Sequence, residues 1–506
     1  MRYDAIVVGA GSGGAALATR LSEDPGRSVL LLEAGPDYPD IDALPSDLKF
    51  NHGTGTDLAV GGQHDWDFVG AATSIADPMP VPRGRVTGGT SAINGSVFLR
   101  GLPEDFDDWA SRGNDQWGYE KVFPYFRKLE TDTDFAGDYH GTEGPIIVRR
   151  FKTDELMDDQ AAFYDACRAA GFPDSPDHNH PDATGVGPLP LNNPNGIRWS
   201  TSIGYLSQAR HRLNLTIRPD CTVQRLVLEG RRATGVVVES GGETFTVQGD
   251  EIILSAGPVA SPQLLMLSGI GPARDLREFG IPVIANLKGV GQNLRDHPAV
   301  QVRWRAKDDF PMPGDDVGPQ KVALRYTAEG SSLRNDMITV MRWNSPERLI
   351  VMSAGLYLAR SSGELRLASP DVAVQPSLNY NYLDDPSDLR RLRDGVRLNL
   401  RLAKHESFDP IIGELLEPSH ADLESDVSLD AWMMRNVQTM HHISGTAKMG
   451  PDSDEMAVLD QFCRVKGIEG LRVADGSVML DCIRANTNAT IIMIGERVAD
   501  FIKDGS

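Results

Sequence analysis

The chain has 506 residues, and its hydrophobic fraction of 40% is enough to bury a large core in two or three structural units. Its 71 acidic and 50 basic residues give a formal net charge of −21. A negative field of this size repels phosphate backbones and anionic lipid headgroups, so it argues against a nucleic-acid partner or a membrane-surface role. A charged fraction of 24% is ordinary for a globular protein and argues against extensive disorder.

The cysteines and the apolar segments bear on the compartment. The four cysteines form no CxxC pair and show no metal-ligand spacing, so they predict neither a disulfide framework nor a metal centre and suit a reducing compartment. No apolar run approaches the ~18 residues that a membrane span requires. Met1 is followed almost at once by the strand-like run Tyr3–Val8, which is unlike the basic start of a secretory leader. We therefore expect a cytoplasmic protein without a membrane span.

The first elements predict a nucleotide site. The apolar run Tyr3–Val8 ends in Gly9-Ala-Gly11-Ser-Gly-Gly14, and Ala15–Leu21 continues as a helix. This order of strand, GxGxxG turn and helix is that of the dinucleotide-binding fold. Gly9 permits the tight turn, Gly11 lets the backbone approach a pyrophosphate, and Gly14 allows the helix to pack closely on the strand. The helix N-terminus offers free N–H groups to the phosphates.

A second strand carries the residue expected at the ribose. The run Ser28–Glu33 is apolar until Glu33, which stands 19 positions after Gly14. At that distance a carboxylate accepts hydrogen bonds from the ribose hydroxyls of the nucleotide. Because NAD and FAD both carry this ribose, the spacing predicts a dinucleotide without choosing between them.

The following segments, up to residue 195, mix loops with one predicted helix. Residues 36–82 are rich in Pro, Asp and Gly and predict a long irregular excursion. The paired Gly88 and Gly89, followed by small residues, predict a backbone pressed against a flat ligand. Phe106–Glu130 has the apolar periodicity of a helix, and Pro173–Asn195 is again a loop.

The middle of the chain is predicted to return to a sheet. Its alternating and apolar runs predict two strands, a hairpin and a buried strand, in the order Leu213–Pro219, Thr222–Leu228, Gly235–Ser240 with Thr244–Val247, and Glu251–Ser255. A turn and a helix follow over Gly257–Gly271.

From about residue 300 to residue 429 the pattern changes and predicts a second, mostly antiparallel domain. Its strand-like runs are Val300–Ala306, Met337–Arg342, Ile350–Tyr357 and Leu365–Ala368. A charged helix near Ser387–Ala403 comes next, and the chain then returns to a buried strand, Leu471–Ala474, and a final helix. Because buried strands stand on both sides of the second domain, the two domains are expected to be interleaved along the chain.

Several ordered blocks carry a family resemblance. The run from Arg83 to Asn94 reads Arg-Gly-Arg-Val-Thr-Gly-Gly-Thr-Ser-Ala-Ile-Asn, and further blocks are Gly257–Gly271, Gly289–Pro298, His442–Gly450 and Asn486–Glu496. In this order they resemble the motifs of the glucose–methanol–choline (GMC) family of FAD-dependent oxidoreductases, with Thr87 where an aliphatic residue is more usual. The resemblance covers nearly the whole chain.

The resemblance implies an α/β fold, α+β overall, in which a Rossmann-like FAD-binding domain is interleaved with a substrate domain built on an antiparallel sheet. Residues 1–299 would form the FAD-binding domain, with excursions at 36–82 and 150–200 contributing to the substrate side. Residues 300–430 would bind the substrate, and residues 431–506 would return to the FAD domain with the catalytic pair.

By position, the resemblance also assigns residues to the parts of FAD. Those implied at the ADP part are Gly9, Gly11, Ser12, Gly14, Glu33 and Ala34, with the backbone of Val223 at the adenine. Those implied along the flavin, its ribityl chain and the pyrophosphate are Gly89, Thr90, Asn94, Gly95, Val97, Asp475 and Gly476. Thr487 or Asn488 would cap the last helix, whose N-terminus would face the flavin and favour its anionic reduced form. Some relatives attach the flavin through a histidine at the position of Ile93, so non-covalent FAD is expected here.

A catalytic pair follows from the same resemblance. His442 takes the position of the active-site base, and an imidazole suits removal of a hydroxyl proton as a hydride leaves carbon. Its neighbour His441 would point the other way if the segment is extended. Asn486 takes the second position, where an amide can donate to the substrate oxygen but cannot take a proton, and Asn488 competes for this role.

Three other histidines are weaker candidates. His297 lies in one of the family blocks and is expected to be structural. His178 and His180 lie in a polar loop, where they could bind adventitious metal, and no specific metal site is expected.

These residues predict an enzyme that oxidises a small-molecule alcohol by hydride transfer to FAD, with O2, a quinone or another organic acceptor reoxidising the flavin. The stretch 300–429 holds few aromatics for a cation cage, whereas the net negative charge would attract cations. We expect a neutral primary alcohol or a sugar-like polyol as substrate. Two alternatives stay open, a choline-type amino-alcohol dehydrogenase and a hydroxynitrile lyase of the same fold with structural FAD.

Overall fold

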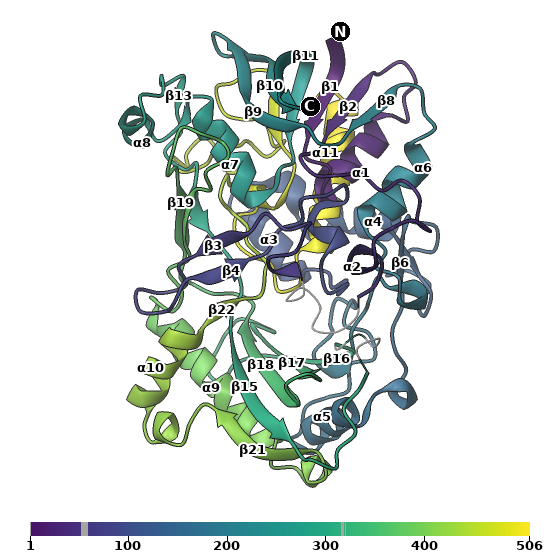
Figure 1. Cartoon of the computed structure of the whole chain (residues 1–506), viewed down its shortest axis with the longest axis vertical. Helices are drawn as coiled ribbons and strands as arrows, with labels where there is room; N and C mark the ends of the chain where they lie inside the picture. The colour runs from purple at the N-terminus through teal and green to yellow at the C-terminus, as the bar shows by residue number, and fades with distance from the viewer. Residues whose placement is uncertain (1, 52–58, 315–317, 319) are drawn as a thin grey trace.

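The computed structural model describes residues 2–51, 59–314, 318 and 320–506. Two sheets of seven strands each lie toward opposite ends of the long axis of the molecule (Figure 1). The predicted α/β class, with a second antiparallel sheet interleaved along the chain, is confirmed.

The first sheet has the strand order β8-β2-β1-β11-β10-β9, and β23 pairs with β11. Its strands are β1 (Arg2–Val8), β2 (Val29–Leu32), β8 (Leu215–Arg218), β9 (Thr222–Glu229), β10 (Arg232–Ser240), β11 (Glu243–Leu254) and β23 (Leu471–Val473). The ladders from β8 to β11 and from β11 to β23 are parallel, whereas β9 and β10 are antiparallel. Short apolar runs such as β2 are buried over their whole length, as expected of central parallel strands.

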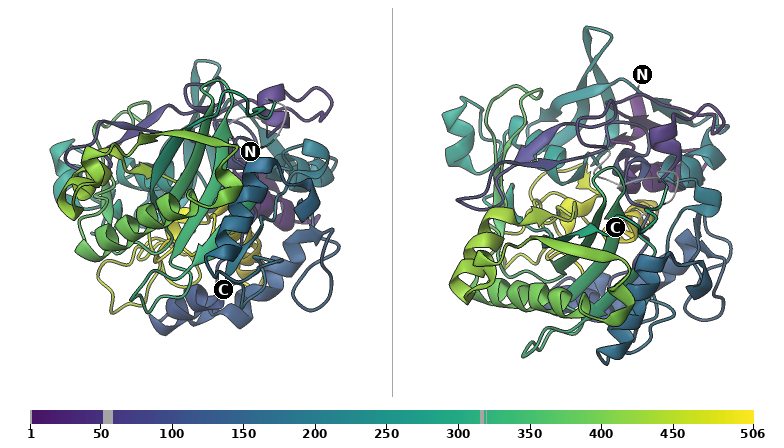
Figure 2. Two further views of the ribbon diagram at one scale, coloured as in Figure 1. Left: turned by 90° about the horizontal axis from the view of Figure 1, so that it is seen from below. Right: turned by 60° about the horizontal axis from the view of Figure 1, so that its bottom comes forward.

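The second sheet has the order β21-β15-β18-β17-β16-β7, with β22 beside β15, and its pairs are antiparallel. Its strands are β7 (Gly185–Pro188), β15 (Pro298–Ala306), β16 (Val322–Tyr326), β17 (Met337–Asn344), β18 (Leu349–Leu356), β21 (Ile412–Glu417) and β22 (Gln438–Thr439). The long helix α9 (Pro386–Leu402) lies along one face of this sheet (Figure 2). That helix begins at Asp385, whose carboxylate accepts the N–H of Ser387 at 2.8 Å.

The other helices and the small sheets fill the space around and between the two large sheets. The remaining helices are α1 (Ser12–Leu21), α2 (Ser46–Lys49), α3 (Pro103–Ser111), α4 (Tyr119–Leu129), α5 (Asp158–Ala169), α6 (Ser207–Ala209), α7 (Gly257–Leu267), α8 (Ala273–Glu278), α10 (Asp426–Asn436) and α11 (Asn488–Lys503). The remaining strands are β3 (Phe68–Gly70), β4 (Met79–Val81), β5 (Glu130–Asp132), β6 (Ile146–Val148), β12 (Ile270–Gly271), β13 (Ala285–Asn286), β14 (Gln292–Leu294), β19 (Gly363–Arg366) and β20 (Ser377–Asn379). Among the helices of the described residues, none combines the length and the apolar character needed to cross a bilayer.

Glycines bring the first and the last helix together. A Cβ on Gly14 would lie 2.0 Å from the carbonyl oxygen of Gly9, so α1 packs directly on the turn that follows β1. A Cβ on Gly495 of α11 would lie 2.4 Å from the carbonyl oxygen of Gly13 in α1. The two helices therefore lie side by side (Figure 1), although they come from opposite ends of the chain.

The predicted hairpin of Gly235–Ser240 with Thr244–Val247 is present as β10 and β11, but its second strand is longer than predicted. The runs Thr244–Val247 and Glu251–Ser255 are not two strands but belong to the single strand β11, which ends at Leu254. Its exposed outer half pairs with β10, and its buried inner half pairs with β1. A Cβ on Gly249, within β11, would lie 2.8 Å from the Ile6 side chain, so β11 passes close to that side chain of β1.

Other predicted elements differ in their limits. The predicted helix over Phe106–Glu130 is two helices, α3 and α4, because the chain turns at Gly113 with a φ of 90°. The run Leu365–Ala368 contributes β19 to a small sheet with β14 and β20 rather than to the second large sheet. The predicted loop Pro173–Asn195 contains β7, an edge strand of the second large sheet.

The predicted excursion over residues 36–82 also contains regular structure, since α2, β3 and β4 lie within it. Its residues 52–58 lie outside the described part of the chain, as do residues 315–317 and 319 of the predicted second domain.

Candidate active site

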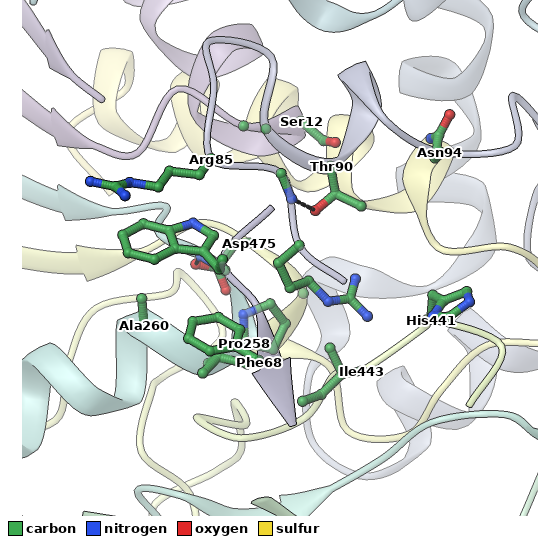
Figure 3. A pocket seen from close by; sticks show the side chains of 18 of the residues that line it. Ser12, Phe68, Arg85, Thr90, Asn94, Pro258, Ala260, His441, Ile443 and Asp475 are labelled. Atoms are coloured by element: carbon green, nitrogen blue, oxygen red, sulfur yellow. Dashed lines mark hydrogen bonds between the residues drawn. The ribbon is translucent and has the colours of Figure 1, made fainter. Parts of the chain in front are cut away.

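A cavity of about 1000 Å³ lies between the two large sheets. The turn after β1, the end of β2 and the start of α11 line it on one side, and strands β15, β17 and β18 line it on the other. Figure 3 shows Ser12, Thr90 and Asn94 on one wall of this cavity, with His441 and Ile443 lower down. Such a volume can hold a dinucleotide together with a small second molecule.

Most of the residues predicted to hold a cofactor line this cavity. They are Gly9, Gly11, Ser12, Glu33, Ala34, Gly89, Thr90, Asn94, Gly95, Val97, Val223, Asp475, Gly476 and Thr487. Gly14 is not among the lining residues, because its place is the contact of α1 with the Gly9 carbonyl. Ile93 is buried in a small apolar cluster with Leu48, Val86 and Ala92, away from the cavity.

Gly11 provides a test of whether a dinucleotide fits. The atom nearest to a Cβ built on Gly11 is the Cα of Gly89, at 3.8 Å, so no protein atom excludes a side chain there. The φ of Gly11 is −76°, which every residue type adopts. The space that a side chain would take is cavity space at the N-terminus of α1. The residues present therefore fit a pyrophosphate close to the backbone.

Glu33 lies at the end of β2 with its carboxylate almost fully buried. Oε2 accepts the N–H of Ala10 at 2.9 Å, and Oε1 accepts the N–H of Gly35 at 2.9 Å. Burial raises the pKa of Glu33 to about 7, against the effect of these backbone donors. A carboxylate offers about four acceptor positions, so Glu33 can accept from a ribose hydroxyl group in addition to these backbone donors.

Other predicted cofactor residues form hydrogen bonds that shape the cavity wall. The Gly84 N–H donates to Thr90 Oγ1 at 3.2 Å, which Figure 3 marks with a dashed line. Asp475 accepts the N–H of Gly257 at 2.9 Å and the hydroxyl of Ser261 at 2.6 Å. It thus ties the start of α7 to the segment after β23.

The predicted catalytic pair is in direct contact. Nδ2 of Asn486 lies 3.1 Å from Nε2 of His442, and both side chains line the cavity. The side chain of Asn488 is turned to Ser12, whose hydroxyl donates to Asn488 Oδ1 at 2.8 Å. The structure therefore brings Asn486, and not Asn488, to the imidazole of His442.

The imidazole of His442 is neutral at neutral pH. Burial lowers the pKa of His442 well below its ordinary value, and repulsion between a protonated His442 and the neighbouring His297, His441 and Arg83 lowers it further. A neutral imidazole offers one nitrogen lone pair, which is what a general base requires.

His441 does not point away from the site as an extended segment would require. It has a φ of 67°, in the left-handed region, so the backbone is not extended at this residue. As a result, His441 and His442 both line the cavity. Such strained conformations of non-glycine residues occur preferentially at functional sites.

Three residues of the site were not predicted as functional. Asp296 accepts the backbone N–H groups of His297 at 2.7 Å and of His442 at 2.8 Å, and His297 contacts the His442 ring. Arg83 lines the cavity, and its Nε and Nη2 have no hydrogen-bond partner among the described residues. Asp296 and His297 stand together as Asp-His-Pro in a family block, and that adjacency is the signal that could have identified them.

The remaining predicted histidines lie elsewhere. His178 is buried rather than in an open polar loop, with Nε2 3.1 Å from the Gly187 carbonyl, and burial lowers its pKa to about 3. The ring of His180 lies edge-on to Tyr139 at 4.7 Å.

A further histidine, His140, lies in a buried cluster of charged groups. Its Nδ1 is 2.9 Å from Asp132 and 3.1 Å from Glu130, and its Nε2 is 2.8 Å from Asp177. Burial alone would lower its pKa, but these carboxylates raise it to about 10. Arg150 bonds Asp132 and Asp177, each at 2.7 Å, and Arg100 bonds Glu130. Arg100, Arg150 and His140 therefore pair with the three carboxylates that contact His140, and Asp134 lies 3.9 Å from Arg150 at the edge of the cluster.

The wall opposite the nucleotide turn belongs to the second sheet. Its strands contribute Ala299, Gln301, Ile338, Val340, Arg342 and Ser353. Gln320 and Gln438 line the same cavity. Among the described residues that these strands place in the cavity there is no carboxylate. This wall therefore presents amide and hydroxyl groups to the cavity, and Arg342 lines it as well.

Comparison with known proteins identifies the family of the chain. A model of the GMC oxidoreductase family matches residues 3–299, and a second model of the same family matches residues 359–495. The oxygen-dependent choline dehydrogenase of Vibrio vulnificus is 35% identical over 99% of this chain and 94% of its own length. Pyridoxine 4-oxidase from Mesorbium loti has a similar structure, with a TM-score of 0.92, 28% identity and 99% of both chains covered.

A formate oxidase from Aspergillus oryzae, studied for modification of its FAD, has a similar fold as well. Its TM-score is 0.89 at 26% identity, over 100% of this chain and 98% of its own.

Proposed function

The chain belongs to the GMC oxidoreductase family, and on this basis we propose that it oxidises a neutral primary alcohol or a sugar-like hydroxyl to a carbonyl, with His442 as base. FAD, the cofactor of this family, supplies the hydride acceptor when it is bound. The observation that carries the proposal is the contact of His442 Nε2 with Asn486 Nδ2 inside the cavity.

The chain's own groups act on the substrate hydroxyl. Because the amide of Asn486 donates toward His442, the facing Nε2 carries a lone pair and no hydrogen. A substrate hydroxyl that inserts between the two groups takes the place of the Asn486 amide at the Nε2 lone pair, and it gives its proton to Nε2 as the hydride leaves the same carbon. Asn486 then donates to the oxygen on which negative charge develops, and holds it in place.

The cavity wall supports a neutral substrate. The second-sheet strands place amides, a hydroxyl and Arg342 in the cavity, and among the described residues they add no carboxylate that would attract an ammonium group. A choline-type substrate is the second candidate, supported by the 35% identity to an oxygen-dependent choline dehydrogenase. Residues 1–299 and 431–506 would hold FAD in this proposal, and residues 300–430, with β7 at the edge, the substrate.

The FAD is proposed to be bound without a covalent link. The position at which some relatives carry the linking histidine is Ile93, and its side chain is packed among Leu48, Val86 and Ala92. Acid precipitation of the purified protein should therefore release yellow FAD into the supernatant. Colour that stays with the pellet would contradict this part of the proposal.

The cytoplasmic location also remains a proposal. The four cysteines Cys167, Cys221, Cys463 and Cys482 are buried free thiols, as suits a reducing compartment.

The test is anaerobic flavin absorbance. The loaded protein is titrated with benzyl alcohol, pyridoxine, glucose and choline, and His442→Ala is measured alongside. Bleaching by one of the neutral alcohols, abolished in His442→Ala, is the expected result. Bleaching by choline alone would favour the second candidate, and an unchanged rate in His442→Ala would refute the assignment of the base. If the flavin colour returns when air is admitted, O2 is the electron acceptor. If it returns only when a quinone is added, the acceptor is an organic molecule.

A further inference from the structure

His297 lies immediately before β15, and its side chain is fully buried. Its Nδ1 is 2.9 Å from Nδ1 of His442. Its Nε2 is 2.8 Å from the main-chain carbonyl oxygen of Ile483. Both ring nitrogens of His297 therefore have a partner, one of which is the ring of the proposed base.

These two contacts determine where the ring hydrogens lie. A carbonyl oxygen can only accept, so Nε2 of His297 must carry a hydrogen. Burial lowers the pKa of His297 to about 4, so the ring is neutral and its Nδ1 carries a lone pair. The hydrogen between the two rings must then belong to Nδ1 of His442, which leaves Nε2 of His442 as the bare nitrogen.

We propose that His297 is a positioning residue that holds His442 in the tautomer with a hydrogen on Nδ1 and a lone pair on Nε2 directed at the substrate. This inference rests on the proposed function, in which Nε2 is the base. When Nε2 takes the hydroxyl proton, His442 becomes an imidazolium. Its Nδ1–H continues to donate to Nδ1 of His297, so no proton moves beyond His442. The lone pair of the neutral His297 imidazole stabilises that cation at Nδ1, whereas the Asp296 carboxylate accepts the backbone N–H of His442.

Neighbouring residues fix the positions of the two imidazole rings. One carboxylate oxygen of Asp296 accepts the backbone N–H groups of both histidines, at 2.7 and 2.8 Å. The other accepts the hydroxyl of Tyr382 at 2.9 Å. The ring of Tyr357 meets the His297 ring edge-on, with centroids 4.8 Å apart. Asp296 thus fixes the backbone of both histidines, and Tyr357 packs against the His297 ring.

A neutral acceptor at this place has a chemical consequence. A carboxylate facing Nδ1, as in a serine-protease triad, would favour the protonated form of the base in the resting enzyme. An imidazole supplies the same directional acceptor without the charge. His442 therefore stays unprotonated until the substrate proton arrives, and the orientation of its lone pair is still defined.

Two isosteric variants test the role of the acceptor. His297→Asn places an amide oxygen where Nδ1 now lies, so it can still accept from His442. His297→Gln places its amide where Nε2 now lies, so it keeps a donor for Ile483 and leaves His442 without an acceptor. The rate of anaerobic flavin reduction is measured with whichever of benzyl alcohol, pyridoxine, glucose or choline reduces the wild type fastest.

We expect His297→Gln to slow reduction by about 10- to 100-fold, since general-base catalysis contributes about 10²- to 10⁴-fold. His297→Asn should remain within about 3-fold of the wild type, with FAD content and substrate Kd unchanged in both. Equal rates in both variants and the wild type would overturn the proposal. Equal losses in both variants with FAD retained would also overturn it, since they would indicate a purely structural role.

A second measurement needs no variant and no substrate. In ¹⁵N-histidine-labelled holoenzyme, an N–H···N bond between two rings gives a ¹⁵N–¹⁵N coupling across the hydrogen bond. We expect that coupling with the hydrogen on His442 Nδ1 and none on Nε2. A hydrogen on Nε2 of His442, or no coupling between the rings, would overturn the proposal even if both variants fail to fold. Loss of activity in His442→Ala with normal His297 variants would refute this inference alone, whereas full activity in His442→Ala would refute the proposed function.

Discussion

The hydroxyl of Ser12, at the first position of α1, donates to the side chain of Asn488, at the first position of α11, over 2.8 Å. This bond joins two helix N-termini that line the same cavity. Neither helix has an acidic residue in its first turn. The positive ends of both helix dipoles therefore face the space in which the pyrophosphate and the reduced flavin would carry negative charge.

The two neighbouring asparagines should have separable roles. Asn488→Ala removes the bond to Ser12, so we expect FAD to bind about 5-fold more weakly, as loss of about 1 kcal/mol implies. Asn486→Ala removes the donor beside His442, so we expect flavin reduction to slow about 100-fold. Titration of the apoprotein with FAD and anaerobic stopped-flow reduction distinguish the two effects. If both variants changed the same quantity, the division of roles would be wrong.

Gly11 and Gly14 form a matched pair for the cofactor turn. A side chain at Gly11 meets no protein atom closer than 3.8 Å, so Gly11→Ala should leave the apoprotein as stable as before or stabilise it by about 0.5 kcal/mol. FAD affinity should fall, because the methyl group enters the pyrophosphate space. Gly14→Ala should instead destabilise the apoprotein by about 2 kcal/mol, since its Cβ would lie 2.0 Å from the Gly9 oxygen.

Urea unfolding of each apoprotein, followed by FAD titration, checks both expectations. A Gly11→Ala protein that binds FAD like the wild type would contradict the position assigned to the pyrophosphate.

The local parts of this site could be predicted, and the relations across the chain could not. The turn around Gly11 and the ribose residue Glu33 follow from spacing within one strand, turn and helix, which is a local pattern. The inward position of His441 depends on its φ of 67°, and this backbone conformation cannot be predicted from the residue type. The contact of His297 with His442 depends on β15 and β22 lying side by side, which only the tertiary structure reveals.

Glu33 should make the stability of the apoprotein depend on pH. Its pKa is raised by burial to about 7, above the value of about 4.3 expected when the chain is unfolded. Between these values the folded state binds more protons, so the free energy of unfolding should fall as the pH rises from about 4.5 to 7, by about 3 kcal/mol in all. Urea unfolding of the apoprotein at pH 5 and pH 8 measures this pH dependence. Glu33→Gln should remove the part of it that the titration of Glu33 causes. An equal slope in the variant would contradict the assignment.

The cluster around His140 should show a dependence of the same sign at higher pH. The pKa of His140 is raised to about 10 by its carboxylates, so its contribution is complete below the unfolded value of about 6.5 and is lost as the pH rises through 10. His140→Gln should lower the free energy of unfolding at pH 8 by about 3 kcal/mol, because it leaves buried carboxylates without their partner. The difference between wild type and variant should shrink at pH 10.5.

A chelator provides the control for this cluster. Because Arg100, Arg150 and His140 already pair with Glu130, Asp132 and Asp177, EDTA should leave the unfolding midpoint unchanged. A midpoint that falls with EDTA and returns with added Zn²⁺ would show that Glu130, Asp132 and His140 hold a metal.

The interleaving of the two sheets has a consequence for how the protein is made. On the ribosome, β1 emerges long before β11, its partner in the centre of the first sheet, and β11 emerges long before β23. Folding must therefore wait for distant segments, which is slow and leaves apolar strands exposed during synthesis. His442 emerges after β11, and Asn486 and Asn488 emerge after β23. Cofactor loading should accordingly be a late step in biogenesis, after the nascent chain has been released.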